Sequence, residues 1–127
     1  MLNQRLPAFC TASGKAILAF LPDEIVQQII DSGMPQYTPN TLVSAESLIE
    51  DLKRTREQGF ALSLQEFEEG IHAIAAPILN KDRQPIASIA VAGPSYRLSY
   101  ERMVEVGPNL LAAVHEIAFE VDLTATT

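Results

Sequence analysis

The sequence predicts an α+β domain in which helices flank one antiparallel sheet. Segments with helical periodicity come first, two apolar strand-like segments follow close together, and a long amphipathic segment ends the chain. The two strand-like segments are Ile71–Leu79 and Pro85–Gly93, and the five residues between them suit a hairpin turn, so the strands should pair antiparallel. With 127 residues, 47% of them hydrophobic, the chain can bury one sizeable core in a single domain.

The first predicted helix begins in the stretch TASGKAILAF, which starts at residue 11. Thr11 or Ser13 is a suitable N-cap residue, and the apolar residues that follow suit a core. A second helix should begin with Pro22 as its first residue and stop at Gly33.

The clearest helical pattern is SAESLIEDLKRTREQG, residues 44–59. Ser44 offers an N-cap and Gly59 a C-terminal stop. Leu48, Ile49 and Leu52 are predicted to share the apolar face of this helix.

The stretch FALSL, residues 60–64, alternates and predicts a further strand, and the acidic turn QEFEEG follows it. The last helix should run roughly from Tyr100 to Val121. Gly107 and Pro108 could split it, because a proline inside a helix costs about 3 kcal/mol.

Composition excludes several functions. A net charge of −7, from 16 acidic and 9 basic residues, argues against a surface that grips a nucleic-acid backbone. Cys10 is the only cysteine, so no intramolecular disulfide can form and a reducing cytoplasm is expected. No apolar run approaches the ~18 residues of a membrane span. His72 and His115 lack neighbours at ligand spacing, so we expect neither a metal nor a cofactor.

The Ser-Gly-Lys at residues 13–15 resembles part of a phosphate-binding loop, but the first glycine and the final hydroxyl of that motif are both missing. Two interpretations stay open. Gly14 can allow close packing at the start of a helix, or the N–H groups of Ala12, Ser13 and Gly14 can hold a carboxylate. Lys15 would then have a structural or surface role.

Few residues suit acid–base catalysis. Adjacent acids such as Glu68 and Glu69 in a turn are more often a solvated surface, and Glu66 is the acid best placed to point inward. A small acid–base enzyme would therefore use Glu66 together with His72. Cys10 is expected to be a small buried hydrophobe rather than a nucleophile.

The two apolar strands carry many small residues, among them Ala73, Ala90 and Ala92. A strand that only filled a core would usually carry larger β-branched residues. The small residues predict either close packing of a helix on the sheet or a ligand pocket whose floor is the sheet.

Taken together, three blocks resemble the effector-binding domain of IclR-family bacterial transcription regulators. They are RLPAFCTASGKAILAFL, TLVSAESLIEDLKRTREQGFALSLQEFEEGIHAIAAPI and PIASIAVAGP, in the family's order and spacing. The resemblance implies a GAF-like or profilin-like antiparallel sheet flanked by helices, and a binding module rather than an enzyme. It also implies that residues 1–127 form a single effector-binding domain, truncated at its N-terminal edge.

In such regulators an N-terminal winged helix-turn-helix domain contacts DNA, so this chain would meet DNA only through a domain that it lacks. The expected partners are a small organic acid effector and further copies of the chain, as a dimer or tetramer, with no membrane. The alternatives are the acid–base enzyme and a ligand-free oligomerisation domain.

The resemblance also implies a binding site. The turn matching Thr11–Gly14 would supply N–H groups, and side chains would come from the positions of Ser63, Ala73, Ala90 and Ala92, with Glu66 beside them. Three of those four strand positions are alanine here, where relatives often carry polar side chains. We therefore expect a larger, less polar pocket, and an effector with a carboxylate head and an apolar or aromatic body.

Overall fold

The computed structural model describes residues 8–125, and the side chains of residues 8–120. It contains four helices and three antiparallel strands, which confirms the α+β class. In chain order these are α1 (Ala12–Leu18), α2 (Asp23–Asp31), α3 (Ala45–Gln58), β1 (Ala61–Leu64), β2 (Ile71–Leu79), β3 (Pro85–Pro94) and α4 (Tyr100–Ala125).

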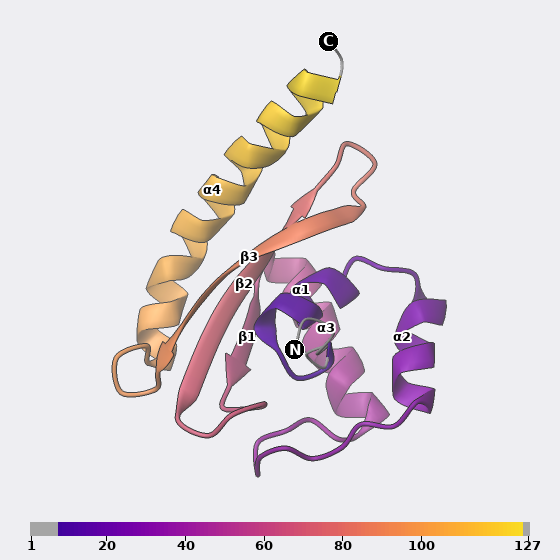
Figure 1. The fold of residues 1–127 in the computed structure, drawn as a ribbon, viewed down its shortest axis with the longest axis vertical. Coiled ribbons are helices and arrows are strands. Elements are labelled where there is room, and N and C mark those ends of the chain that lie inside the picture. The colour runs from indigo at the N-terminus through magenta and orange to yellow at the C-terminus, as the bar shows by residue number, and fades with distance from the viewer. Residues whose placement is uncertain (1–7, 126–127) are drawn as a thin grey trace, which may run out of the picture.

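The sheet has the order β1-β2-β3 and lies between two helical layers (Figure 1). The long helix α4 crosses one face, while α1 and α3 lie on the other and α2 stands farther out. Among the described helices, none is long and apolar enough to cross a membrane.

Strand register sorts the side chains between the two faces. Ser63 pairs with Ala73, which pairs with Ala92, and on the next row Ala61 and Ala90 flank Ala75. Because successive side chains of a strand alternate, these small residues share the face toward α1. Ile74 and Ile78 of β2 point the other way, toward α4.

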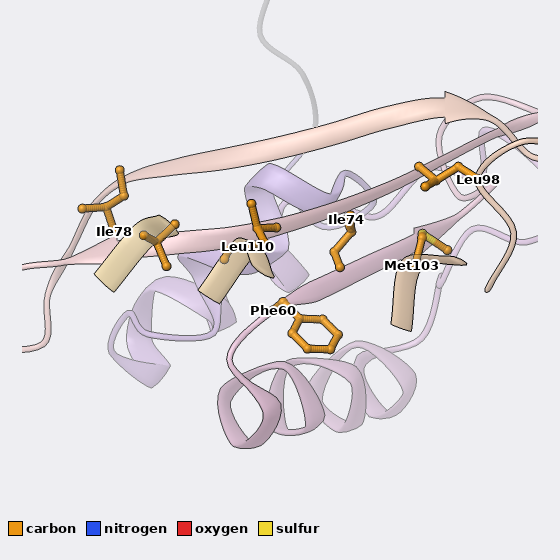
Figure 2. Packing of buried hydrophobic residues seen from close by; sticks show 8 residues of the cluster. Phe60, Ile74, Ile78, Leu98, Met103 and Leu110 are labelled. Atoms are coloured by element: carbon orange, nitrogen blue, oxygen red, sulfur yellow. The ribbon is translucent and has the colours of Figure 1, made fainter. Parts of the chain in front are cut away.

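The main core lies between the sheet and α4 (Figure 2). Its buried members include Phe60, Ile74, Ile78, Met103 and Leu110. Gly107 is required here, because a Cβ at this position would lie 2.7 Å from the Phe60 ring. The glycine lets α4 approach the start of β1.

The last helix is present as predicted, and Gly107 and Pro108 do not split it, because α4 continues through Pro108. A proline cannot donate to the carbonyl four residues earlier, which here belongs to Val104. Both residues are exposed, so water can satisfy that carbonyl and the helix need not end.

Helix α1 lies close to the sheet, where Ala12 and Ala16 pack with Ala61 and Ala75 in a buried cluster of small residues. Close packing of a helix on the sheet, one of the two interpretations of the small-residue strands, is therefore confirmed at Ala61 and Ala75.

The predicted helix ends are largely confirmed. The Thr11 hydroxyl accepts from the Gly14 N–H at 3.2 Å, the Ser44 hydroxyl accepts from the Ser47 N–H at 3.1 Å, and Gly59 ends α3 at φ 93°. Pro22 is the N-cap of α2 rather than its first residue. The prediction for Ile49 is wrong: it is 51% exposed, because the buried face of α3 is narrow and is formed by Leu48, Leu52 and Thr55.

Candidate functional site

A small pocket of about 90 Å³ lies where the start of α1 meets β1 and β2. It is lined by Thr11, Ala12, Ser63, Phe67, Glu68, Ile71 and Ala73. Four residues of the predicted set therefore come together: Thr11, Ala12, Ser63 and Ala73. This volume is below the roughly 150 Å³ of an engineered cavity that binds benzene, so the pocket is smaller than the alanine-rich strands led us to expect.

Ser63 supplies a side-chain hydroxyl to this pocket. It is 5% exposed, and its Oγ donates to the backbone carbonyl of Cys10 at 3.2 Å. This bond joins β1 to the residue just before the N-cap of α1. A hydroxyl can rotate, so Ser63 can turn its donor toward a bound acceptor.

Of the two interpretations left open for Gly14, the structure shows close packing at the start of a helix. A Cβ there would lie 2.4 Å from the Cα of Ala8, so the glycine admits the preceding chain rather than a ligand. Its N–H is already bonded to the Thr11 hydroxyl. Ser13 is half-buried but does not line the pocket, so the predicted set of three N–H groups is reduced to Ala12 beside the cavity.

Ala90 and Ala92 also lie outside the pocket. They share the sheet face of Ala73, yet both are exposed. The reason is that β3 is an outer strand of the sheet. Alternation placed these residues on the correct face, but the pocket is confined to the β1–β2 side.

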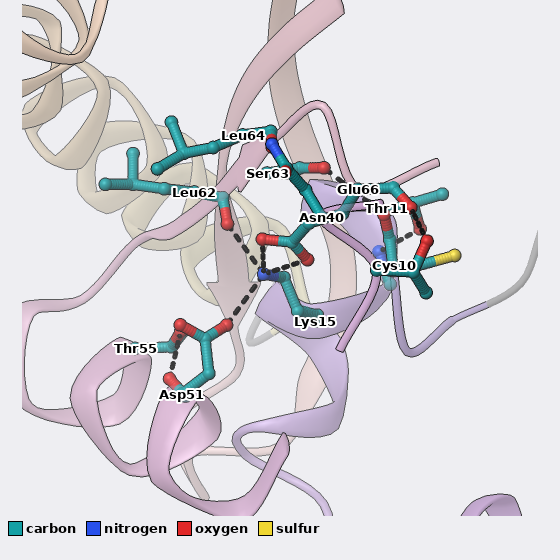
Figure 3. A network of polar contacts seen from close by, with 12 residues as sticks. Cys10, Thr11, Lys15, Asn40, Asp51, Thr55, Leu62, Ser63, Leu64 and Glu66 are labelled. Carbon is teal, nitrogen blue, oxygen red and sulfur yellow. Dashed lines mark hydrogen bonds and ion pairs between the residues drawn. The ribbon is translucent and has the colours of Figure 1, made fainter. Parts of the chain in front are cut away.

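A buried ion-pair network lies next to the pocket, centred on Lys15 (Figure 3). The Lys15 side chain is 0% exposed, so the alternative of a surface role is wrong and the structural role is confirmed. Its Nζ donates to both Glu66 carboxylate oxygens at 2.8 and 3.0 Å, to Asp51 Oδ2 at 2.7 Å and to the Leu62 carbonyl at 2.6 Å. One side chain thus links α1, α3, β1 and the β1–β2 loop.

Glu66 points inward, as predicted, but toward Lys15 and not into the pocket. Burial raises the pKa of its carboxyl, and the Lys15 ammonium opposes that rise. Its backbone carbonyl accepts from the Thr41 hydroxyl at 2.6 Å, which fixes the loop. Glu66 is therefore a support of the site rather than a lining residue.

The geometry does not support the acid–base enzyme. His72 Nδ1 donates to the Leu98 carbonyl at 2.7 Å, on the face covered by α4, whereas Glu66 is bonded on the α1 face. Burial and the nearby Glu66 carboxylate raise the pKa of the Cys10 thiol to about 11, so Cys10 is a poor nucleophile, as expected. Within residues 8–120, no cluster of three His, Cys, Asp or Glu side chains could hold a metal ion.

Three further pocket residues, Phe67, Glu68 and Ile71, were not predicted from the sequence. They flank the turn at Gly70, and a signal was present in the apolar Phe67 within an otherwise acidic stretch. Asp51 was also missed, because nothing near it in the sequence indicates a lysine partner on another helix.

Residues 2–119 match the family described as bacterial transcriptional regulator IclR, C-terminal. The HTH-type transcriptional repressor AllR of Escherichia coli K12 is 34% identical over 125 residues, which is 98% of this chain and 46% of the repressor. This chain therefore spans about half the length of the curated relatives it matches.

Two solved structures extend the likeness. The C-terminal domain of the E. coli regulator KdgR has a TM-score of 0.84 at 32% identity, covering 94% of this chain and 73% of that one. A double mutant of the PobR inducer-binding domain from Acinetobacter, in complex with 3-hydroxybenzoic acid, has a TM-score of 0.83 at 30% identity, covering 91% and 67%. Those relatives are regulators of transcription rather than enzymes. This chain belongs to the IclR family of bacterial transcriptional regulators and carries its C-terminal, effector-binding domain.

Proposed function

We propose that the pocket beside α1 binds a small organic acid and that its occupancy is passed to a DNA-binding domain outside this chain, in the cytoplasm. The observation that carries the proposal is the convergence of Thr11, Ala12, Ser63 and Ala73 on one cavity. The inducer-binding domain of PobR, which has a similar fold, is the domain of that protein solved with a hydroxybenzoic acid.

The lining indicates how an acid would be held. The Ala12 N–H belongs to the first turn of α1, where a backbone donor has no acceptor within the helix, and the Ser63 hydroxyl can donate beside it. Phe67, Ile71 and Ala73 give the rest of the cavity an apolar surface. Glu68 is exposed at the rim, where solvent screens its charge.

The volume sets the size of the effector. A cavity below the roughly 150 Å³ that holds benzene suits a small oxo- or hydroxy-acid as it stands. An effector with an aromatic body would require Phe67 and the loop around it to move outward. We therefore place small acids first and retain aromatic acids as a second class.

The test is a thermal-shift panel of small oxo-acids and hydroxybenzoates on three proteins: wild type, Ala73→Leu and Ala90→Leu. Both variants add the same side chain to the same sheet face, but only Ala73 lines the pocket. A bound acid at 100 times its Kd should stabilise wild type and Ala90→Leu by about 2.7 kcal/mol and leave Ala73→Leu unchanged.

A panel in which no acid stabilises wild type would overturn the proposal and favour a ligand-free oligomerisation domain. Equal stabilisation of Ala73→Leu would show that the acid binds at another site.

Self-association, as a dimer or tetramer, stays a prediction. Val104, Ile117 and Phe119 of α4 are exposed apolar positions that could serve it.

A further inference from the structure

Two arginines converge on one aromatic ring away from the effector pocket. Arg56 lies in the last turn of α3, Arg83 in the turn between β2 and β3, and Phe20 just after α1. The Cζ atom of each arginine is 5.7 Å from the centroid of the Phe20 ring. The two guanidinium carbons therefore cannot be farther apart than twice that distance.

Neither of these arginines is neutralised by a carboxylate of the described residues, whereas Arg54 and Arg102 each pair with an acid, at 3.0 and 3.1 Å. Three carboxylates lie nearby: Glu57 lines a groove together with both arginines, and Asp23 and Asp82 line an adjoining hollow. None of the three forms an ion pair with either arginine. The ring attracts both cations, but their mutual repulsion remains, and an anion placed between them would relieve it.

The ring and both arginines line a groove of about 290 Å³. Its lining from β2 and α4 is apolar except for His115, and the apolar residues there are Pro77, Leu79, Leu111, Val114 and Ala118. The groove thus has a cationic end and an apolar wall, and its volume is near the lower limit of small-molecule sites, roughly 300 Å³.

We propose that this groove is a second binding site, for a small molecule with a carboxylate or phosphate head and an apolar body. The guanidinium groups of Arg56 and Arg83 hold the head, because a planar guanidinium pairs with two oxygens of such a group at once. The apolar body lies along the wall of β2 and α4. None of these residues lines the effector pocket, so the second site does not depend on the first.

The site is tested by calorimetric titration with phenyl phosphate, benzoate, inorganic phosphate and phenol. Phenyl phosphate should bind more tightly than inorganic phosphate, which lacks the body, and phenol, which lacks the charge, should not bind. The ratio between phenyl phosphate and benzoate assigns the head as phosphate or carboxylate. Ring signals of Phe20 in NMR spectra should shift on titration.

The variants are Arg56→Gln and Arg83→Gln, with Arg97→Gln as the control. All three arginines are exposed and lose the same charge, but Arg97 lies in the turn before α4 and outside the groove. Each groove variant should weaken binding about tenfold or more, as expected for a lost charge-assisted hydrogen bond, while Arg97→Gln and the pocket variant Ala73→Leu should not.

Three results would overturn the proposal. They are no binding of either aromatic anion to wild type, equal weakening by Arg97→Gln, and binding that is insensitive to one of the two groove arginines. If Ala73→Leu alone weakened binding of the anions, they would be assigned to the effector pocket. Failure of this proposal can therefore be distinguished from failure of the proposed function.

Discussion

Replacing Lys15 by methionine tests how much of the fold depends on the buried ion pair. Methionine retains most of the length of the side chain and removes the ammonium. Glu66, only 6% exposed, then loses the one cation with which it pairs among the described residues. Asp51 is affected less, because it also pairs with Arg54 at 3.0 Å.

The expected cost follows from the uncompensated carboxylate. Removing one partner of a buried ion pair typically costs about 3–5 kcal/mol. The free energy of unfolding of a whole domain is only about 5–15 kcal/mol, so Lys15→Met should remove a large part of it. Urea unfolding should show a lower midpoint at an unchanged slope.

The cost should also depend on pH. Burial raises the pKa of Glu66 above its ordinary value, and Lys15 opposes that rise. An acid with a raised pKa holds its proton more tightly in the folded state, so its contribution to stability falls as pH rises from the ordinary glutamate range to the folded pKa. Without Lys15 the folded pKa rises further. The variant should therefore lose more stability at about pH 8 than at about pH 5.

The double variant Lys15→Met/Glu66→Gln is the control, because the amide cannot titrate and its loss of stability should not grow with pH. Urea midpoints of wild type and both variants at the two pH values are sufficient. A loss below about 1 kcal/mol for Lys15→Met at the higher pH, the range of an exposed pair, would refute the reasoning. So would a loss that is equal at both pH values.

Two further predictions concern the residues around α1. Gly14→Ala should lower stability by about 1–3 kcal/mol in urea unfolding, because the new Cβ meets the Ala8 backbone at 2.4 Å and cannot rotate away; an unchanged midpoint would mean that this approach is not maintained in solution. Cys10, which is 0% exposed and has its pKa raised to about 11, should react with a thiol reagent only when the domain unfolds. Rapid labelling of the native protein at mildly alkaline pH would contradict that expectation.

The helix ends and the strands could be predicted because their chemistry is local. Thr11 and Ser44 each accept a hydrogen bond from three residues ahead, and Gly59 takes a backbone conformation that suits glycine. Pro108 shows the limit of this approach. Whether a proline ends a helix depends on whether solvent reaches the freed carbonyl, and that is decided by tertiary packing.

The candidate site was predicted only in part, because its local features can be inferred from the sequence and its tertiary contacts cannot. Alternation placed Ser63, Ala73 and Ala92 on one face, but it could not show that the pocket ends before β3. Lys15 and Glu66 are 51 positions apart, and no spacing rule connects a lysine in one helix with an acid in a distant loop. The contact between Lys15 and Glu66, which supports the pocket, could therefore not be predicted from the sequence.

The pocket and the ion pair share two segments of the chain. Helix α1 gives Ala12 to the pocket and Lys15 to the ion pair, and the loop after β1 gives Phe67 to the pocket and Glu66 to the pair. Outward movement of Phe67 would enlarge a cavity of about 90 Å³, but it would also strain the bonds of its neighbour Glu66. If this pocket binds the effector, as proposed, a larger effector would have to displace the loop, whereas a small acid would not.

This coupling can be measured by loosening the loop without burying a charge. Thr41→Val removes the hydroxyl that donates to the Glu66 backbone carbonyl at 2.6 Å. The control is Thr55→Val, because Thr55 is also buried and its hydroxyl donates to the Asp51 backbone carbonyl within α3 at 2.8 Å. Thr41→Val should raise the affinity for a hydroxybenzoate relative to a small oxo-acid, because less work is needed to move the loop, and Thr55→Val should leave the ratio unchanged. An unchanged ratio in both variants would show that the loop does not limit the size of the effector.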